Sequence, residues 1–236
     1  IKRSINISLN CIGNLYKTLE QYDLAIVQFK RALKFEEELD NKLGLAINHQ
    51  NIGNCLEQKG DLEGALENYR KSLVYNEEID SDFGRIICKN SLAQIYLKQG
   101  MPYAALVLLE PLFEQTRSVG DFYVTSSVFI NTGWAHTELG NFDKAEEFIQ
   151  DGLDMARTHN MPSNVLYGYR KFSDFELKRG NYQRAYEYYK KADEYDEEIS
   201  SATNFRYMND IIVRYEADKK NNQISVLAKE NEIVRL

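Results

Sequence analysis

Residues 52–69, with the sequence IGNCLEQKGDLEGALENY, decide the fold because their pattern recurs along the chain at a fixed spacing. Gly53 and Ala65 are small residues of this stretch, Tyr69 is a bulky one, and Gly60 lies between them. Similar residues stand 40 positions before or after these sites. Such self-similarity is typical of repeat architectures, in which each unit packs mainly against its neighbours.

Four columns of residues define five repeats of 40 residues without an insertion or a deletion. The first column is small and consists of Gly13, Gly53, Ala93, Gly133 and Ser173. The second column consists of Ala25, Ala65, Ala105, Ala145 and Ala185. The third column is bulky and consists of Phe29, Tyr69, Leu109, Ile149 and Tyr189. The fourth column contains Gly60, Gly100, Gly140 and Gly180, with Glu20 as its one exception.

Each column has a physical role in a pair of packed helices. Small residues let the two helices of a hairpin approach closely, and we expect the bulky residue to fill the space between successive hairpins. The glycine is expected to end the first helix in the left-handed conformation. Asp61, Asn141 and Asn181 follow it as expected N-caps of the second helix, and Pro102 enters the first turn in the third repeat. The pattern therefore predicts helix, tight turn, helix in every repeat.

The motifs that carry these columns resemble the tetratricopeptide repeat family. They are Ile12-Gly13-x-x-Tyr16 with Ala25, Phe29 and Ala32, and Ile52-Gly53 with Gly60-Asp61, Ala65 and Tyr69. The resemblance covers about residues 6–200 and implies an all-α fold, a right-handed superhelical solenoid of five helical hairpins. HEAT-type arrays share the period but lack the Gly-Asp turn.

One difference from the family explains the length of the repeat. The commoner form of about 34 residues ends its second helix with a proline. At that position this chain has Glu37, Glu77, Arg117, Arg157 and Glu197. Without the proline, we expect the second helix to continue for one to two turns, which accounts for the longer period.

Residues 201–236 are expected to form a separate segment, because the repeat pattern that organises residues 1–200 is lost there. We predict a long C-terminal helix whose first part caps the last repeat. The apolar residues of this first part are Phe205, Met208, Ile211, Ile212 and Tyr215. The second part has apolar residues at Ile224, Leu227 and Val234, which suits either a short coiled coil, and hence a homodimer, or a solvated helix end.

The amino-acid sequence of this segment also resembles a linker. Residues 214–220 and 223–232 are similar to the segment that joins a tetratricopeptide array to an output module in bacterial sensor proteins. In those proteins the output is a histidine kinase, a diguanylate cyclase or a helix-turn-helix domain, and a transmembrane helix often lies between. A membrane anchor, if present, is expected outside residues 1–236.

The family geometry implies a concave groove lined by the first helix of each hairpin. The expected groove residues are Asn10, Asn14, Gln50, Asn51, Asn54, Asn90, Gln94, Asn131, Trp134, Arg170, Lys171 and Asp174. Most of them are amides, which offer both a donor and an acceptor and can therefore pair with the backbone of an extended peptide. The alternative is that the amides bond to neighbouring helices and set only the stacking.

Two further groove features have two interpretations each. Trp134, the one tryptophan, is either an aromatic anchor for a ligand or a filler of the core. Arg170, Lys171 and Lys178 either form a dock for a carboxylate or belong to an ordinary charged helix face.

Composition and motifs argue against several other function classes. The net charge of −7 gives no basic face for a nucleic acid. His49, His136 and His159 lie in different repeats without a nucleophile or a metal-ligand pattern, so we expect no catalysis, no metal and no cofactor. His136 is expected to take the packing role of Tyr16 and Tyr96. The three cysteines are expected to be small hydrophobic residues in helix interfaces.

These observations predict a protein- or peptide-binding sensor domain of a bacterial signal-transduction protein, which relays its ligand state through the C-terminal helix. The alternatives are a cytosolic regulator of the peptide-pheromone type and a passive assembly scaffold. A membrane-anchored sensor with the array outside the cytoplasm is favoured over a cytoplasmic location, although free thiols favour the inside. The chain begins with Ile1 rather than Met, so we expect it to be a piece of a longer protein.

Overall fold

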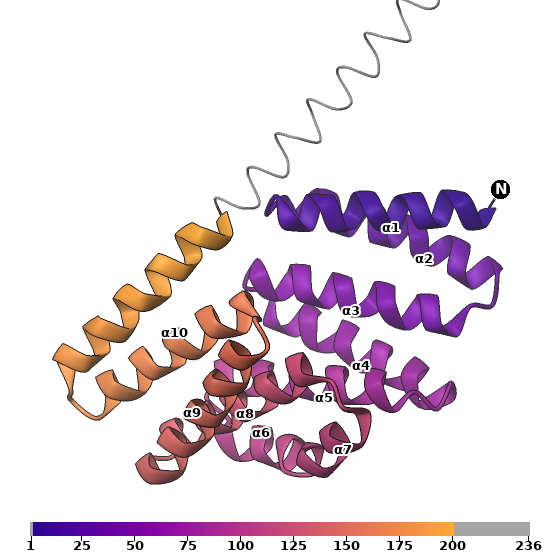
Figure 1. Ribbon diagram of the computed structural model, residues 1–236. Helices are drawn as coiled ribbons and strands as arrows, with labels where there is room; N and C mark the ends of the chain where they lie inside the picture. Colours follow the sequence, from indigo (N-terminus) through magenta and orange to yellow (C-terminus); the bar gives the residue numbers. More distant parts are fainter. Residues whose placement is uncertain (1, 201–236) are drawn as a thin grey trace, which may run out of the picture.

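The computed structural model describes residues 2–200, and every regular element in this range is a helix. The helices are α1 (Lys2–Thr18), α2 (Tyr22–Glu38), α3 (Lys42–Gln58), α4 (Leu62–Glu78), α5 (Asp82–Lys98), α6 (Pro102–Leu109), α7 (Leu112–Val119), α8 (Phe122–Glu138), α9 (Phe142–Thr158) and α10 (Pro162–Lys178). A further helix covers residues 182–200 (Figure 1). The predicted all-α class and the five hairpins are confirmed. The expected capping helix, coiled coil and linker lie outside the described residues.

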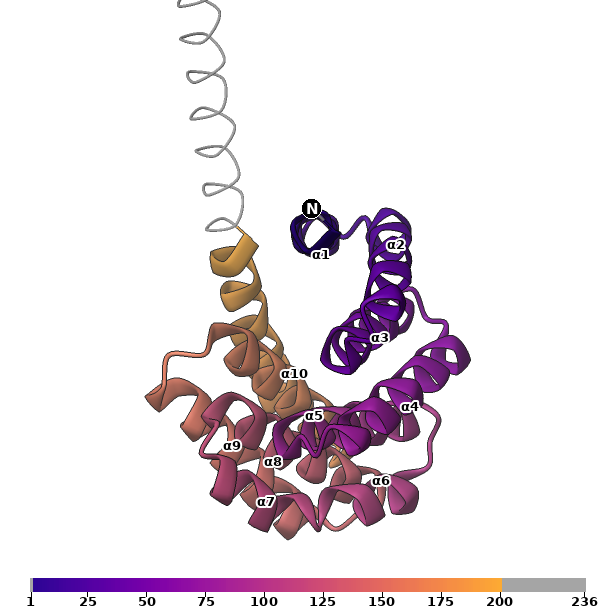
Figure 2. The same ribbon diagram turned by 90° about the vertical axis from the view of Figure 1, so that its right-hand side faces the viewer.

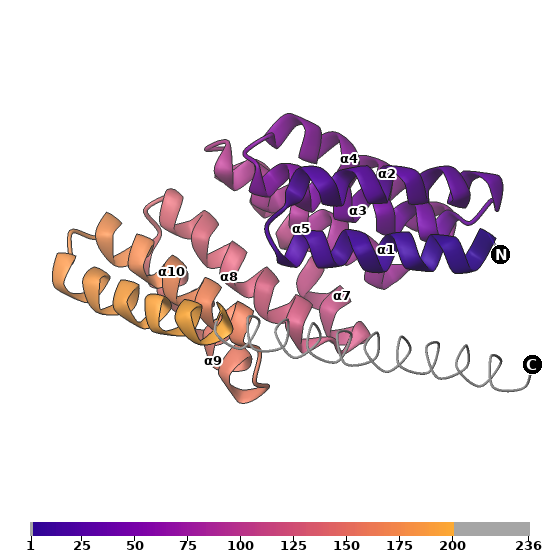
Figure 3. The ribbon, with the colours of Figure 1, turned by 90° about the horizontal axis from the view of Figure 1, so that it is seen from above.

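The hairpins stack into a curved array with two layers. The first helices α1, α3, α5, α8 and α10 form the inner layer, and the second helices α2, α4, α6, α7 and α9 form the outer layer (Figures 2 and 3). Neighbouring inner helices pack against one another, α3 on α5, α5 on α8 and α8 on α10. Among the described helices, successive outer helices make no comparable contact. The array therefore curves toward its inner layer and leaves that face concave.

The small and bulky columns meet inside each of the first two hairpins. A Cβ atom added to Gly13 would lie 2.6 Å from the ring of Phe29, and one added to Gly53 would lie 2.6 Å from the ring of Tyr69. The ring therefore lies directly on the backbone of the first helix. Phe29 also belongs to a buried cluster with Ile52 of the next hairpin. The expectation that the bulky residue only fills the space between hairpins was thus incomplete.

The last hairpin departs from this arrangement. Tyr189 is 59% exposed, although it occupies the bulky column. Its opposite residue is Ser173, whose hydroxyl donates a 2.8 Å hydrogen bond to the carbonyl of Ala185. Ser173 stands where the first, second and fourth hairpins have glycine, and Tyr189 belongs to the last described hairpin, so no following hairpin among residues 2–200 covers its ring. The expectation that Tyr189 is buried was wrong.

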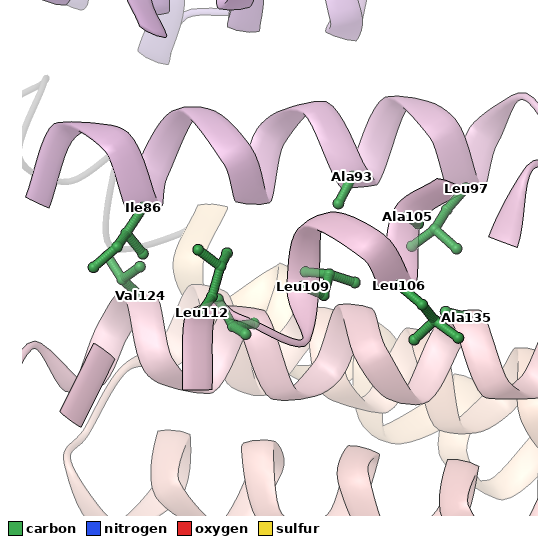
Figure 4. Close-up of a cluster of buried hydrophobic side chains, with 10 residues drawn as sticks. Ile86, Ala93, Leu97, Ala105, Leu106, Leu109, Leu112, Val124 and Ala135 are labelled. Carbon is green, nitrogen blue, oxygen red and sulfur yellow. The ribbon is translucent and has the colours of Figure 1, made fainter. Parts of the chain in front are cut away.

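The buried hydrophobic residues of the described helices form four clusters along the array. One cluster joins α5, α6, α7 and α8, and several of its members are shown in Figure 4. Ala93 and Leu109 there are fully buried, as are Ala105 and Leu112. Alanines of the second column are at most 5% exposed in all five hairpins. The sequence therefore predicted the packing of this column correctly.

The second helix of the third hairpin is broken into two, α6 and α7, although the repeat pattern predicted a single helix there. Pro111 separates α6 from α7 because it has no N–H and its ring clashes with the preceding turn. After the break, Phe113 packs on Phe129 and Phe148 with ring centroids 5.1 and 5.4 Å apart. Pro102 lies at the start of α6, as expected.

Left-handed residues end the helices at two places in each of the first four repeats and at one described place in the fifth. The predicted glycine column is confirmed, with φ between +72° and +83° at Gly60, Gly100, Gly140 and Gly180. Glu20 fills the same position with φ of +57°. The sequence analysis did not identify a second such column, which ends the second helices at Asp40, Asp80, Gly120 and Asn160. Asp and Asn tolerate this conformation better than most residues with a Cβ atom.

Two local expectations need correction. Asp61 caps α4 by accepting a hydrogen bond from the amide of Gly64, as predicted. Asn141 precedes α9 but makes no side-chain cap; it lies 3.4 Å from Nδ1 of His136. Cys55 and Cys88 are buried as expected, whereas Cys11 lies exposed on α1.

No helix among residues 2–200 is long and apolar enough to cross a membrane.

The left-handed turns give a prediction for stability. Gly140→Ala should lower the free energy of unfolding by about 1 kcal/mol, because an L-residue is strained at φ of +74° while nothing blocks its side chain. Asn160→Gly, the matched change at the other column, should be neutral or stabilising. Urea unfolding followed by circular dichroism measures both, and a neutral Gly140→Ala would contradict this assignment.

Candidate functional site

The concave face contains a pocket of about 440 Å³ at its centre. Its walls come from α3, α5, α8, α10 and the helix over residues 182–200, so four successive hairpins contribute to one surface. The lining residues are Glu57, Gln58, Gln94, Lys98, Trp134, Tyr167, Arg170, Lys171, Ser173, Asp174 and Tyr189. Five of these belong to the predicted groove set: Gln94, Trp134, Arg170, Lys171 and Asp174. The structure therefore brings the second half of that set together.

One wall of this pocket is a partly buried ion pair between repeats. Nζ of Lys98 on α5 lies 2.6 Å from Oε1 of Glu57 on α3. The other carboxylate oxygen of Glu57 accepts a 2.6 Å hydrogen bond from the hydroxyl of Tyr69. The Glu57 side chain is 3% exposed, so removing Lys98 alone would leave a buried charge without its partner. Burial, together with the Glu57 carboxylate, raises the pKa of Tyr69 and keeps its hydroxyl protonated.

The opposite wall carries the tryptophan. Nζ of Lys171 lies 3.6 Å from the centroid of the Trp134 ring, a cation–π arrangement. The same ammonium group also binds Asp174 at 2.9 Å. Nε1 of Trp134 donates a 3.3 Å hydrogen bond to Glu138. Trp134 is half-buried and lines the pocket together with Lys171.

The predicted basic end of the groove is neutralised within the protein. Arg170 binds Asp196 at 2.7 Å, and Lys171 binds Asp174. Lys178 pairs with Glu138 of the preceding repeat. An acidic ligand would therefore have to compete with these carboxylates. The geometry favours a partner that presents both donors and acceptors over one that presents only negative charge.

A chain of hydrogen bonds connects the inner helices below the pocket. Nδ2 of Asn131 on α8 donates to Oδ1 of Asn90 on α5 at 2.8 Å, and Nδ2 of Asn90 donates to Ser127 at 2.9 Å. The hydroxyl of Tyr167 on α10 donates to Oδ1 of Asn131 at 2.5 Å. Gln94 of α5 donates a 3.1 Å hydrogen bond to the same hydroxyl. The Tyr167 side chain therefore connects the third, fourth and fifth repeats.

These contacts decide what several predicted amides do. Asn131 is fully buried, and both its oxygen and its nitrogen are used within the network. Gln50 donates to Ser91 of the next repeat at 2.9 Å, and Asn51 accepts from Lys17 at 3.0 Å. For these side chains the structure displays the bonding between helices that was the alternative interpretation. Asn10 bonds to Asn6 within α1.

Two amides of the predicted set stay outside this network. Asn14 is exposed on α1, and Asn54 is half-buried on α3 beside the hydroxyl of Tyr69. They occupy the same repeat position as Gln94, Trp134 and Asp174, each 40 residues apart. This column therefore runs along the concave face through all five hairpins.

Sequence analysis missed Tyr167, Glu57 and Lys98. An alternation of charge was available, since Lys98, Glu138 and Lys178 stand 40 residues apart and alternate in sign, and it predicts the pair of Glu138 with Lys178. It does not identify Glu57, which lies outside this column and is the partner of Lys98. Tyr167 gave no such signal, because the residues at its repeat position are Ile47, Ile87 and Ser127. Its partner Gln94 lies 73 residues away, and only the curvature of the array brings them together.

The histidines lie apart from this pocket. His136 is buried and stacks on Phe148 with ring centroids 5.7 Å apart, as its predicted packing role requires. Burial is the main reason that its pKa is lowered, with a contribution from Lys144. Residues 2–200 contain no group of three or more His, Cys, Asp or Glu side chains placed to hold a metal ion.

Family comparison agrees with the repeat pattern. A family model described as tetratricopeptide repeat matches residues 4–73 and 85–158, and a second with the same description matches residues 172–199. These ranges cover most of the chain and fall in all five hairpins. The chain belongs to the tetratricopeptide repeat family. Arrays of this family generally act as interaction scaffolds rather than as enzymes. A comparison with curated proteins gives no significant match.

Solved structures with the same fold include two Rap proteins. The Rap protein complexed with Competence and Sporulation Factor has a TM-score of 0.71 and 17% identity, and the match covers 81% of this chain and 54% of that one. The Rap conjugation gene regulator of the plasmid pLS20, in complex with the Phr* peptide, has a TM-score of 0.69 and 15% identity, with 80% and 52% covered. This tetratricopeptide array thus spans about half the length of either Rap protein.

A third similar structure is that of the nearly identical TPR-like repeats of a putative kinesin light chain from Podosopora anserina. It has a TM-score of 0.58 and 13% identity, and the match covers 82% of this chain and 95% of that one. At such identities the likeness concerns the fold alone.

The network below the pocket gives a prediction for the tetratricopeptide array. Tyr167→Phe should lower the free energy of unfolding by about 1–2 kcal/mol, because Gln94 and Asn131 lose a part-buried partner. Tyr103→Phe is the matched control, since Tyr103 is 74% exposed and should change little. Chemical denaturation of both variants measures the difference; equal effects would mean that the network contributes nothing.

Proposed function

We propose that this tetratricopeptide array binds an extended segment of a partner protein or a peptide in its concave groove, and that it catalyses no reaction. The observation that carries the proposal is the pocket of about 440 Å³ built by four hairpins, with Trp134 in its wall. An aromatic side chain that is half-buried beside satisfied ion pairs is a favourable contact for a ligand.

The available amides support an extended ligand rather than a compact one. Asn14 and Asn54 stand in the same column as Trp134, on the inner layer of the array. An extended peptide leaves its backbone N–H and C=O groups unpaired, and an amide side chain can satisfy one of each. Amides repeated at a constant spacing can therefore hold a backbone whatever its sequence.

The similar structures add a separate argument. The Rap conjugation gene regulator of pLS20 is in complex with the Phr* peptide, and another Rap protein is complexed with Competence and Sporulation Factor. Because the same fold serves those complexes, a peptide is a reasonable ligand class for this chain.

We propose further that the array is the sensor region of a bacterial signal-transduction protein. In this hypothesis, ligand binding changes the pitch of the superhelix, and the segment over residues 201–236 passes that change to an output module. Such coupling requires two arrangements with different ligand affinity. A cytosolic regulator of the peptide-pheromone type is the second candidate, favoured by the likeness to the Rap proteins. Ligand-dependent activity of an attached output domain would exclude the passive scaffold.

The binding proposal predicts the effect of removing the available amides. Asn14→Ala combined with Asn54→Ala should weaken binding of peptides selected from a displayed random library by at least about 10-fold, at roughly 1 kcal/mol for each lost hydrogen bond. The free energy of unfolding should fall by no more than about 1 kcal/mol, because Asn14 is exposed and Asn54 has one interhelical partner, the hydroxyl of Tyr69. Fluorescence anisotropy and urea unfolding give the two quantities.

The control is Gln150→Ala on the outer helix α9, which should leave binding unchanged. Two results would contradict the proposal. One is a library that yields no peptide specific for the array. The other is a double variant that binds normally but is much less stable, which would assign Asn14 and Asn54 to stacking.

A further inference from the structure

A second pocket, of about 290 Å³, opens between α3 and α5 near the beginnings of the two helices. Leu43 and Ile47 of α3 line one side, and Phe83 and Ile87 of α5 line the other. Ile47 lies on the same face of α3 as Asn51, Asn54 and Gln58, because successive members are three or four residues apart. Gln58 lines the central pocket, so one face of α3 connects the two pockets.

The apolar side chains of this pocket are open to solvent. Leu43 is 51% exposed, Ile47 is 50% exposed and Phe83 is 43% exposed. Four large apolar residues from two helices thus surround one depression. Covering them with an apolar group would remove that surface from water, which is favourable in rough proportion to its area.

Three polar residues in the wall of the pocket, Ser72, Asn76 and Cys88, bond to one another or to the backbone. The hydroxyl of Ser72 donates to the carbonyl of Ala46 at 2.8 Å, and Nδ2 of Asn76 donates to the carbonyl of Ser72 at 2.9 Å. The thiol of Cys88 lies 3.2 Å from the Ser72 hydroxyl. A polar occupant would lose its water and gain no partner from these groups, so the chemistry of the wall selects an apolar occupant.

This combination of residues occurs at one junction between repeats. The equivalent residues at the next junction are Phe83, Ile87, Tyr123 and Ser127. At the last junction they are Tyr123, Ser127, Ser163 and Tyr167, all of which carry a hydroxyl group. At the first junction Arg3 takes the place that Leu43 has at the second. The pocket is therefore a property of this chain at the second junction and not of the repeat in general.

We propose that this pocket holds one bulky aliphatic or aromatic side chain of the partner segment. The proposal rests on the proposed function, because it places that residue on the same ligand as the portion in the central pocket. The ligand class is accordingly an extended segment with an apolar anchor residue toward one end and donor and acceptor groups toward the other. The apolar anchor binds at the junction of α3 and α5, and the polar portion lies against Trp134, Lys171 and Asp174.

The first experiment uses small probes and does not require the natural ligand. N-acetyl-leucinamide, N-acetyl-phenylalaninamide and N-acetyl-lysinamide are titrated into the full chain labelled at its leucine and isoleucine methyl groups. The leucine and phenylalanine probes should shift the methyl resonances of Leu43, Ile47 and Ile87, and the lysine probe should not. Equal shifts from all three probes, or shifts spread over the whole chain, would overturn the proposal.

Ile47→Trp is the variant that fills the pocket. Since Ile47 is half-exposed, the larger side chain can be accommodated without disturbing the core, and the shifts at Leu43 and Ile87 should disappear. Val107→Trp on the outer helix α6 is the matched control, because Val107 is 72% exposed and lies away from the groove. A normal thermal melt for both variants shows that they fold.

The second experiment separates the two proposals. Peptides selected from a random library should share one large apolar residue, and replacing it by alanine should weaken binding at least about 10-fold in the parent chain and much less in Ile47→Trp. Selected peptides that lack such a preference would overturn the pocket and leave the groove proposal intact. Leucine-probe shifts without any selected peptide would sustain the pocket and overturn the groove proposal.

Discussion

The contact between a bulky side chain on the second helix and the backbone of the first helix is the constraint from which the rest of the structure follows. The ring of Tyr69 occupies the space that a Cβ atom of Gly53 would need. At that distance the two helices have one relative position, and the buried alanine four residues before the bulky one lies on the same face of the second helix. Hairpins built on the same columns then stack in a similar way, so a local steric rule repeated about every 40 residues contributes to the curvature of the whole array.

Curvature in turn determines the chemistry of the two faces. The inner helices are close enough to bond to one another, and Tyr167 joins α10 to α5 across a whole repeat. Polar residues on the inner face therefore divide into those that hold the array together and those that face solvent. The two pockets lie on that face, one with paired charges around Trp134 and one with apolar walls between α3 and α5. A ligand that spans both needs different chemistry at its two ends.

The sequence predicted the elements that depend on backbone spacing and failed where a side chain has a choice of partner. The small, alanine and glycine columns were correct because close helix contact and a left-handed turn accept few residue types. The break at Pro111 was not predicted, because the repeat columns do not include this position and the other four repeats have no proline there. Tyr189 is exposed although the other four residues of its column are buried, because no described hairpin follows it, and the column alone does not indicate this. For Asn131, no local pattern distinguishes an amide that faces a groove from one bonded to a helix that a distant repeat supplies.

A double-mutant cycle at the ring-on-backbone contact tests the account most directly. The third repeat pairs Ala93 with Leu109 where the second pairs Gly53 with Tyr69, so Tyr69→Leu makes room that Gly53→Ala can use. The account predicts that Gly53→Ala lowers the free energy of unfolding in the parent chain but is neutral or stabilising in Tyr69→Leu, with a coupling of about 1–3 kcal/mol. Strictly additive free energies in urea unfolding would mean that the ring does not set the approach of the helices.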